Sequence, residues 1–309
     1  MEQFVEVAAG IEIWAEMIDG PEQPAEPILL VMGANAAGVA WPDALVSRLT
    51  GHAPVIRYDH RDTGRSSYAF DEHPYAIRDL AADAVAVLDA FDVERAHVVG
   101  MSMGGILAQL LLLDAPERLL SATLLCTTAL GSGLAADGPE EDGPEEDGAE
   151  EELPGPDPAL LRLWQELGDE RDDEGELAWR VEHWRMLNGT GTPFDADEFR
   201  ALEERVIAHA GRSDNPGAHA FAAQDGLDRG DDLADVDVPV LVIEAPDDPV
   251  NPPPHSTHLA RRIGGSRLVR IQGMGHALNA TVVEPVAAAI LGQVGLANAQ
   301  ASTGSAPQR

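Results

Sequence analysis

The chain has 309 residues, 44% of them apolar and 5% aromatic, and its formal net charge is −34 at pH 7. This length and apolar content suit one large α/β domain that carries an insertion. A surface this acidic repels phosphate backbones and anionic headgroups, which disfavours nucleic acids and membranes as partners. Neither a secretory signal nor a run of about 18 apolar residues is evident. The single cysteine, Cys126, cannot form an intrachain disulfide, and we expect a cytoplasmic location.

Strand and helix signals alternate along the first 130 residues, which predicts a parallel sheet covered by helices on both faces. Strands are expected at Phe4–Val7, Ile11–Glu16, Pro27–Met32, Pro54–Asp59, His97–Met101 and Leu119–Cys126. Helices with apolar spacing are expected between them, at Trp41–Leu49, Tyr75–Phe91 and Gly105–Leu113.

The second part of the chain has a different character. Residues 131–157 are rich in glycine, proline and acid, with ten acidic and no basic residues between 137 and 152, and we expect them to be disordered. Residues 158–221 have a helical pattern. Strands are expected again at Asp237–Glu244 and Arg267–Ile271, a helix at Pro285–Val294 and a polar tail at 297–309. The predicted core is therefore 1–130 plus 222–296, with 158–221 as a helical lid above the strand ends.

The strongest local signal is Gly100-Met101-Ser102-Met103-Gly104, which lies between an expected strand and an expected helix. This is the G-x-S-x-G pattern of a nucleophile elbow, in which glycine relieves crowding around a sharp turn. The turn presents the serine hydroxyl above the sheet, at the start of a helix whose dipole favours negative charge. The pattern predicts that Ser102 is a nucleophile.

A serine hydroxyl is a poor nucleophile without a base. His276 is the favoured base because it follows the last expected strand within Gly273-Met274-Gly275-His276. His60 also follows an expected strand and is the one rival with comparable placement, whereas His97 begins a strand and should lie at the opposite end of the sheet from Ser102.

The acid that orients the base should follow another strand. Asp247 and Asp248 both lie in the loop after Asp237–Glu244; spacing alone does not distinguish them, and we favour Asp248. An oxyanion hole needs two N–H groups, which we assign to Met103, directly after the nucleophile, and to Ala34, in the loop after Pro27–Met32.

Two other groups of polar residues are given structural roles. His255 and His258 lie three residues apart on an expected helix with no identifiable third ligand, so we expect a solvated helix face and no metal. Arg61, Asp62 and Arg65 are expected to join loops by ion pairs. No cofactor is expected.

Five stretches have a further significance when they are taken together. They are V-M-G-A-N, Y-D-H-R-D-T-G-R-S (58–66), H-V-V-G-M-S-M-G-G, W-R-M-L-N-G-T-G-T-P-F-D (184–195) and G-M-G-H-A-L. Their combination resembles the aclacinomycin methylesterases, α/β hydrolases of anthracycline biosynthesis that remove a carbomethoxy methyl group from a polyketide aglycone. The resemblance runs from about Val5 to Leu291 and implies an α/β-hydrolase fold, with a mostly parallel sheet, flanking helices and a helical lid insertion. It also implies Ser102, Asp248 and His276 as the triad, and Ala34 and Met103 as oxyanion donors.

The predicted function is hydrolysis of a carboxylic ester through a Ser102 acyl-enzyme, with a methyl ester of a bulky aromatic, polyketide-like acid as the implied substrate. General small-ester or lactone hydrolysis and cofactor-free haloperoxidase-like activity are alternatives, since these reactions use the same triad. A non-catalytic ligand-binding scaffold is disfavoured because no triad position is missing. Large side chains of the lid are candidates either for the substrate pocket or for packing of the lid: Trp164, Trp184, Met186, Phe194 and Phe199.

Overall fold

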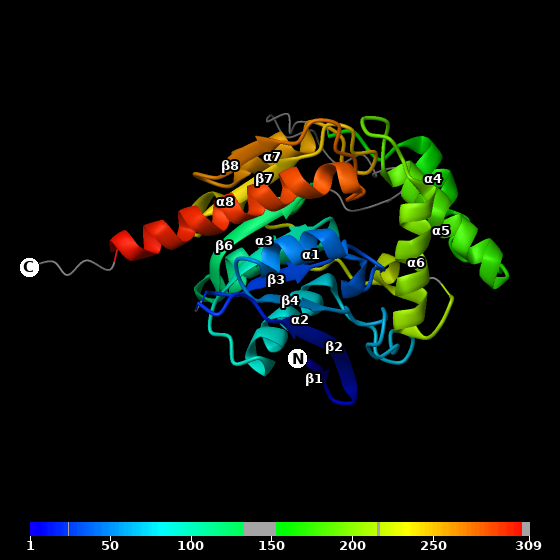
Figure 1. The fold of residues 1–309 in the computed structure, drawn as a ribbon, viewed down its shortest axis with the longest axis horizontal. Helices are drawn as coiled ribbons and strands as arrows, with labels where there is room; N and C mark the ends of the chain where they lie inside the picture. Colours follow the sequence, from blue (N-terminus) through cyan, green and yellow to red (C-terminus); the bar gives the residue numbers. More distant parts are fainter. Residues whose placement is uncertain (24, 133–152, 215–216, 305–309) are drawn as a thin grey trace, which may run out of the picture.

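The structure is a computed structural model, and it describes residues 1–23, 25–132, 153–214 and 217–304 (Figure 1). Eight strands form one sheet in the order β1-β2-β4-β3-β5-β6-β7-β8. Their bounds are β1 Glu2–Ala8, β2 Ile11–Ile18, β3 Ile28–Val31, β4 Val55–Tyr58, β5 Ala96–Met101, β6 Leu119–Leu125, β7 Val240–Glu244 and β8 Arg267–Arg270. β2 pairs antiparallel with β1 and β4, and the other neighbouring pairs are parallel. All eight predicted strands are therefore confirmed.

Helices cover both faces of the sheet, as the alternating pattern predicted. One core cluster packs α2 (Ile77–Ala90), α3 (Met103–Asp114) and α7 (His255–Arg262) on one face. A second cluster packs α1 (Asp43–Thr50) and α8 (Ala280–Gly304) on the other. Because these strands are buried on both sides, β3 and the first four residues of β7 are continuous apolar runs rather than alternating ones. Short 3₁₀ helices lie in the connections between these elements: η1 Gly38–Ala40, η2 Pro116–Arg118, η3 Ala218–Phe221 and η4 Asp231–Asp235.

The lid consists of α4 (Pro158–Trp164), α5 (Asp173–Leu187) and α6 (Ala196–Ala210), grouped together beside the sheet in Figure 1. Each helix begins at an aspartate whose carboxylate accepts a backbone N–H of the first turn, which satisfies a donor that the helix leaves free. α6 ends at Gly211, whose φ of 69° is the left-handed conformation that favours glycine.

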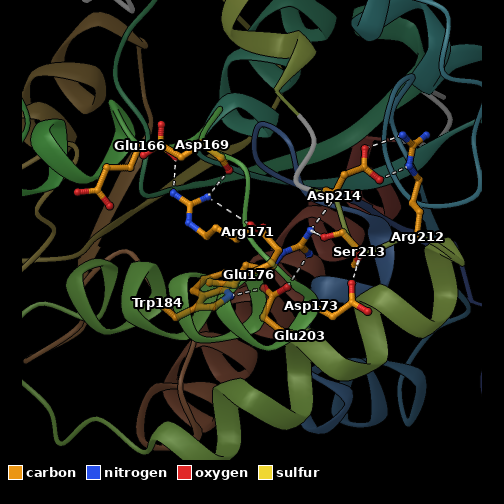
Figure 2. Close-up of polar contacts among 11 residues, drawn as sticks. Glu166, Asp169, Arg171, Asp173, Glu176, Trp184, Glu203, Arg212, Ser213 and Asp214 are labelled. Atoms are coloured by element: carbon orange, nitrogen blue, oxygen red, sulfur yellow. Dashed lines mark hydrogen bonds and ion pairs between the residues drawn. The ribbon is translucent and has the colours of Figure 1, made fainter.

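A buried ionic cluster holds the lid helices together. Arg180 of α5 donates to Glu176 of the same helix at 2.9 Å and to Glu203 of α6 at 3.0 Å. It also donates to the carbonyls of Ser213 and Asp214, at 2.9 and 3.0 Å. Figure 2 labels the four partners, Glu176, Glu203, Ser213 and Asp214, and shows the indole of Trp184 directed at the Glu203 carboxylate, to which it donates a hydrogen bond. The cluster joins both long lid helices to the segment that follows α6.

The structure bears on three expectations, which concern the acidic segment, the C-terminal tail and the absence of a long apolar helix. Residues 133–152, most of the acidic segment, are outside them, whereas 153–157 lie against the core, with the Asp157 N–H donating to the Pro249 carbonyl at 2.8 Å. The boundary expected at 297 is wrong, because α8 continues to Gly304. By length and composition alone, Ala280–Gln300 could cross a membrane, but 44% of its most apolar window is buried in the protein, and a core helix passes the same test.

The histidines of α7 also differ from the prediction. His255 and His258 are 5% and 8% exposed, so they do not form a solvated helix face. The reason is that α7 packs on the sheet, and His255 is hydrogen-bonded to the Thr128 hydroxyl and the Pro154 carbonyl, both at 2.8 Å.

Candidate active site

Ser102 lies at the sharp turn between β5 and α3, with φ of 55° and ψ of −122°. Such dihedrals are strained for a residue with a side chain and are held only where the surroundings enforce them. The elements around Ser102 are tightly packed. A Cβ on Gly100 would lie 2.2 Å from the Gly104 carbonyl oxygen, and a Cβ on Gly104 would lie 2.1 Å from the Val31 carbonyl oxygen. The glycines of the motif therefore allow β3, β5 and α3 to approach closely enough to form the elbow.

His276 follows β8 and is hydrogen-bonded to Asp248, which follows β7. Its Nδ1 lies 2.9 and 3.0 Å from the two carboxylate oxygens of Asp248. Because carboxylate oxygens accept, Nδ1 is the protonated nitrogen and Nε2 is left as the acceptor. Burial raises the pKa of the Asp248 carboxyl, but attraction to His276 and the hydrogen bonds from His276, Asn251 and Val250 outweigh it, and the net pKa lies below its ordinary value.

The structure distinguishes the two neighbouring aspartates that spacing left open. Only Asp248 contacts the imidazole. The Asp247 side chain is turned to the lid, where a Cβ on Gly191 would lie 2.3 Å from its Oδ2. The preference for Asp248 as the partner of His276 therefore agrees with the geometry.

The loop that carries His276 is joined to the end of α5. The backbone N–H groups of His276 and Ala277 both donate to the Leu187 carbonyl, at 2.7 and 3.2 Å. A Cβ on Gly275 would lie 2.2 Å from the Asn188 carbonyl oxygen, and the Asn279 amide donates to the Asn188 side chain. The imidazole is thus positioned by the lid as well as by β8.

The loop after β3 lies directly against the elbow. A Cβ on Gly33 would be 3.1 Å from the Ser102 Cβ, and Ala34, Met103 and Ser102 all line one cavity. His60, the rival base, does not line this cavity. Its Nε2 instead lies 2.9 Å from the Met32 carbonyl, so it is engaged in holding the loop.

The cavity has a volume of about 910 Å³ and lies between the lid and the strand ends. Ser102 and His276 both line it, as do Trp164 and Trp184. Met186, Phe194 and Phe199 are not among its lining residues. They instead join the apolar cluster inside the lid, where Phe199 stacks on Trp184 and Phe194 with ring centroids 5.3 and 5.1 Å apart. For these three residues the packing alternative is correct.

Several lining residues were not singled out from the sequence, among them His183, Glu203 and His219. His183 accepts a hydrogen bond from the Trp164 indole at 2.9 Å, and burial, with the charge of His276, lowers its pKa to about 4. The only sequence feature that could have indicated His183 as a lining residue is that it directly precedes Trp184. The predicted structural roles of the 61–65 stretch agree with the geometry, since Arg61 pairs with Asp83 at 2.6 Å.

One group of potential metal ligands is found among the described residues, and it coincides with this site. Atoms of Cys126, Asp248 and His276 lie within 4.8 Å of one another. Burial raises the pKa of the Cys126 thiol well above its ordinary value, which keeps it protonated, and the carboxylate and imidazole already bind each other. The donors therefore suit a hydrogen-bonded pair better than a metal, which requires deprotonated ligands.

Comparison with known proteins places the chain among hydrolases. Residues 26–151 match the alpha/beta hydrolase fold family and residues 220–291 match the TAP-like protein family. The chain is 49% identical to the rhodomycin D methylesterase DauP of Streptomyces sp. (strain C5) over 284 residues, which cover 91% of this chain and 94% of the relative. It is 48% identical to the rhodomycin D methylesterase DnrP of Streptomyces peucetius with the same coverage.

More distant similarity extends the same pattern. A putative carbamate hydrolase, RutD of Azorhizobium caulinodans, is 30% identical over 87% of this chain and 91% of its own length. The crystal structure of a hydrolase from Pseudomonas aeruginosa PA01 is 27% identical, with a TM-score of 0.68 over 95% of this chain and 98% of that one. The chain therefore belongs to the α/β-hydrolase family, with rhodomycin D methylesterases as relatives that match it over almost its whole length.

Proposed function

We propose that this chain, a carboxylic ester hydrolase by family, cleaves the methyl ester of a polycyclic aromatic acid of the anthracycline class, with Ser102 as nucleophile. The observation that carries the proposal is that Asp248, His276 and Ser102 come together at the strand ends. Asp248 holds His276 Nδ1 at 2.9 Å, and His276 and Ser102 line the same cavity. The similarity to rhodomycin D methylesterases supports the choice of substrate class.

The reaction proceeds in two halves. In the first, Ser102 Oγ attacks the ester carbonyl carbon while His276 Nε2 takes the hydroxyl proton, and the carbonyl oxygen becomes an oxyanion that accepts from the N–H groups of Ala34 and Met103. The tetrahedral carbon then expels methoxide, which receives the proton from His276 and leaves as methanol. In the second half, water attacks the acyl-enzyme with His276 as base, and the free acid departs as Ser102 recovers its proton.

The cavity supports a bulky acyl part. Small-molecule pockets span roughly 300–1,000 Å³, so a volume of about 910 Å³ is far more than a short acyl ester would fill. The two lining tryptophans, Trp164 and Trp184, offer flat apolar surfaces suited to fused aromatic rings. Asp248 has its pKa lowered, so it stays ionised at neutral pH and stabilises the His276 cation that forms in both halves of the reaction.

The test combines Ser102→Ala with a substrate profile. Ser102→Ala should lower turnover of a p-nitrophenyl ester by several orders of magnitude and abolish labelling by a fluorophosphonate probe. Among substrates, methyl esters of fused-ring aromatic acids should exceed short acyl esters and lactones in kcat/KM. Full turnover by purified Ser102→Ala would refute the mechanism, and a sole preference for short acyl esters or lactones would refute the substrate class.

A further inference from the structure

The loop between β3 and η1 is hydrogen-bonded to a histidine at two positions, Met32 and Asn35. At its start, His60 Nε2 lies 2.9 Å from the Met32 carbonyl. Three residues later, the Asn35 N–H donates to His219 Nδ1 at 2.8 Å. The two rings meet edge to face with centroids 5.6 Å apart. Between these attachments lie Gly33, packed against Ser102, and Ala34, to which we assign an oxyanion donor.

His219 reaches this loop from η3, 184 residues beyond Asn35, and makes two hydrogen bonds to Asn35 and one to Arg61. Besides accepting from Asn35, its own backbone N–H donates to the Asn35 side-chain oxygen at 3.2 Å, and its Nε2 lies 3.0 Å from the Arg61 carbonyl. Because Nδ1 must accept and Nε2 must donate, these contacts require the neutral imidazole with its proton on Nε2. Burial lowers the pKa of His219 to about 4, which keeps the ring in that form at neutral pH.

We propose that His219 is a positioning residue for the oxyanion loop, an inference that rests on the proposed function. Asn35 has a φ of 58°, in the left-handed region that asparagine adopts more readily than most residues with side chains. The peptide between Ala34 and Asn35 is planar, so fixing the Asn35 N–H fixes that plane and leaves only the φ and ψ torsions of Ala34 between it and the Ala34 N–H. His219 thereby holds the donor in place before substrate arrives, which is the condition for oxyanion stabilisation without reorganisation.

Two substitutions test the roles of the two ring nitrogens separately. In His219→Asn the amide oxygen can replace Nδ1 as acceptor for Asn35, whereas in His219→Gln a polar group is retained only near the Nε2 position. We expect His219→Asn to keep kcat for a p-nitrophenyl ester within about 3-fold, and His219→Gln to lose about 10- to 100-fold in kcat with little change in KM. Equal kcat in the two variants, or the reverse order, would overturn the proposal.

His97 provides the matched control. It is 1% exposed, its Nδ1 is hydrogen-bonded to the Ser121 hydroxyl at 2.8 Å, and burial lowers its pKa to about 4, but it lies at the start of β5, away from the elbow. His97→Gln should lower the melting temperature about as much as His219→Gln does and leave kcat unchanged. If His97→Gln lost kcat to the same degree, the effect at His219 would be one of general stability and the proposal would fail.

A second readout applies where His219→Gln does not fold well. His219→Ala opens a space beside the cavity, and added imidazole should raise its kcat; no response to imidazole would count against the proposal. Ser102→Ala distinguishes failure of the positioning role of His219 from failure of the proposed function. An inactive Ser102→Ala with a fully active His219→Gln would refute the positioning role alone, whereas an active Ser102→Ala would refute the proposed function.

Discussion

Replacing Arg180 by methionine should lower the free energy of unfolding far more than replacing an exposed arginine of the lid. Arg180 is 6% exposed, and its partners Glu176 and Glu203 are 7% and 6% exposed. The substitution removes two ion pairs of 2.9 and 3.0 Å and two hydrogen bonds to carbonyls. It leaves two carboxylates, each less than 10% exposed, without this guanidinium partner.

The magnitude follows from what remains to neutralise those carboxylates. Breaking a buried pair by removing one partner costs about 3–5 kcal/mol. Here Glu176 keeps an ion pair with Arg171 at 3.3 Å and Glu203 keeps the Trp184 indole, so the loss should be near the lower limit, about 3 kcal/mol. Changing Glu203 to glutamine in the same chain removes one unpaired charge and should recover part of this loss.

Urea unfolding of the variant and of a control measures the effect. The control is Arg200→Met, since Arg200 pairs with Glu174 on the same lid but the two side chains are 37% and 75% exposed. Its loss should stay below about 1 kcal/mol. The KM for a bulky ester should rise in Arg180→Met, because the cluster borders the cavity. A loss below about 1 kcal/mol in Arg180→Met would show that the buried cluster does not hold the lid together.

Three further predictions concern the elbow, the acid and the buried histidines. Asp248→Asn should lower kcat by about 10⁴-fold, since the amide favours the wrong imidazole tautomer; Asp247→Asn should stay within about 10-fold, and equal losses would contradict the assignment. Gly104→Ala should cost about 3 kcal/mol or more in urea unfolding, because its Cβ would lie 2.1 Å from a carbonyl oxygen, whereas Gly292→Ala, with open space around it in α8, should stabilise by about 0.5–1 kcal/mol. The pKa of His97 is about 4 in the folded protein and 6.5 in the unfolded chain. The unfolded chain therefore takes up the proton first, and the free energy of unfolding decreases as the pH falls from 6.5 to 4. When the pH is lowered from 7 to 5, the unfolding free energy should decrease by about 2 kcal/mol less in His97→Gln than in the parent chain. Equal decreases in the two proteins would refute this.

The sequence was informative wherever one short segment determines the outcome. The G-x-S-x-G pattern located the elbow because its glycines meet backbone atoms of neighbouring elements, and the strand runs located all eight strands because burial on both faces requires apolar side chains. Placement of His276 and Asp248 followed from the rule that parallel strands end at one edge. These inferences needed no knowledge of how distant helices pack.

Features that depend on packing between distant segments were not accessible in this way. Phe194 and Phe199 have the same apolar character as Trp164, and only the arrangement of α4, α5 and α6 decides which of them faces the cavity. His219 carried no local signal, because its role arises from contact with a loop far away in sequence. His255 was expected on a solvated face, but α7 turns it toward the core.

The hydrogen bonds from the backbone of His276 and Ala277 to the Leu187 carbonyl limit how the enclosure over the site can open. A hinge at the end of α5 would pull the imidazole away from its carboxylate each time product departed. Exchange with solvent should therefore take place away from the end of α5. For the same reason, grafting lid helices from one relative to another should alter the turnover rate as well as substrate choice, unless the turn at 187–192 is transferred intact.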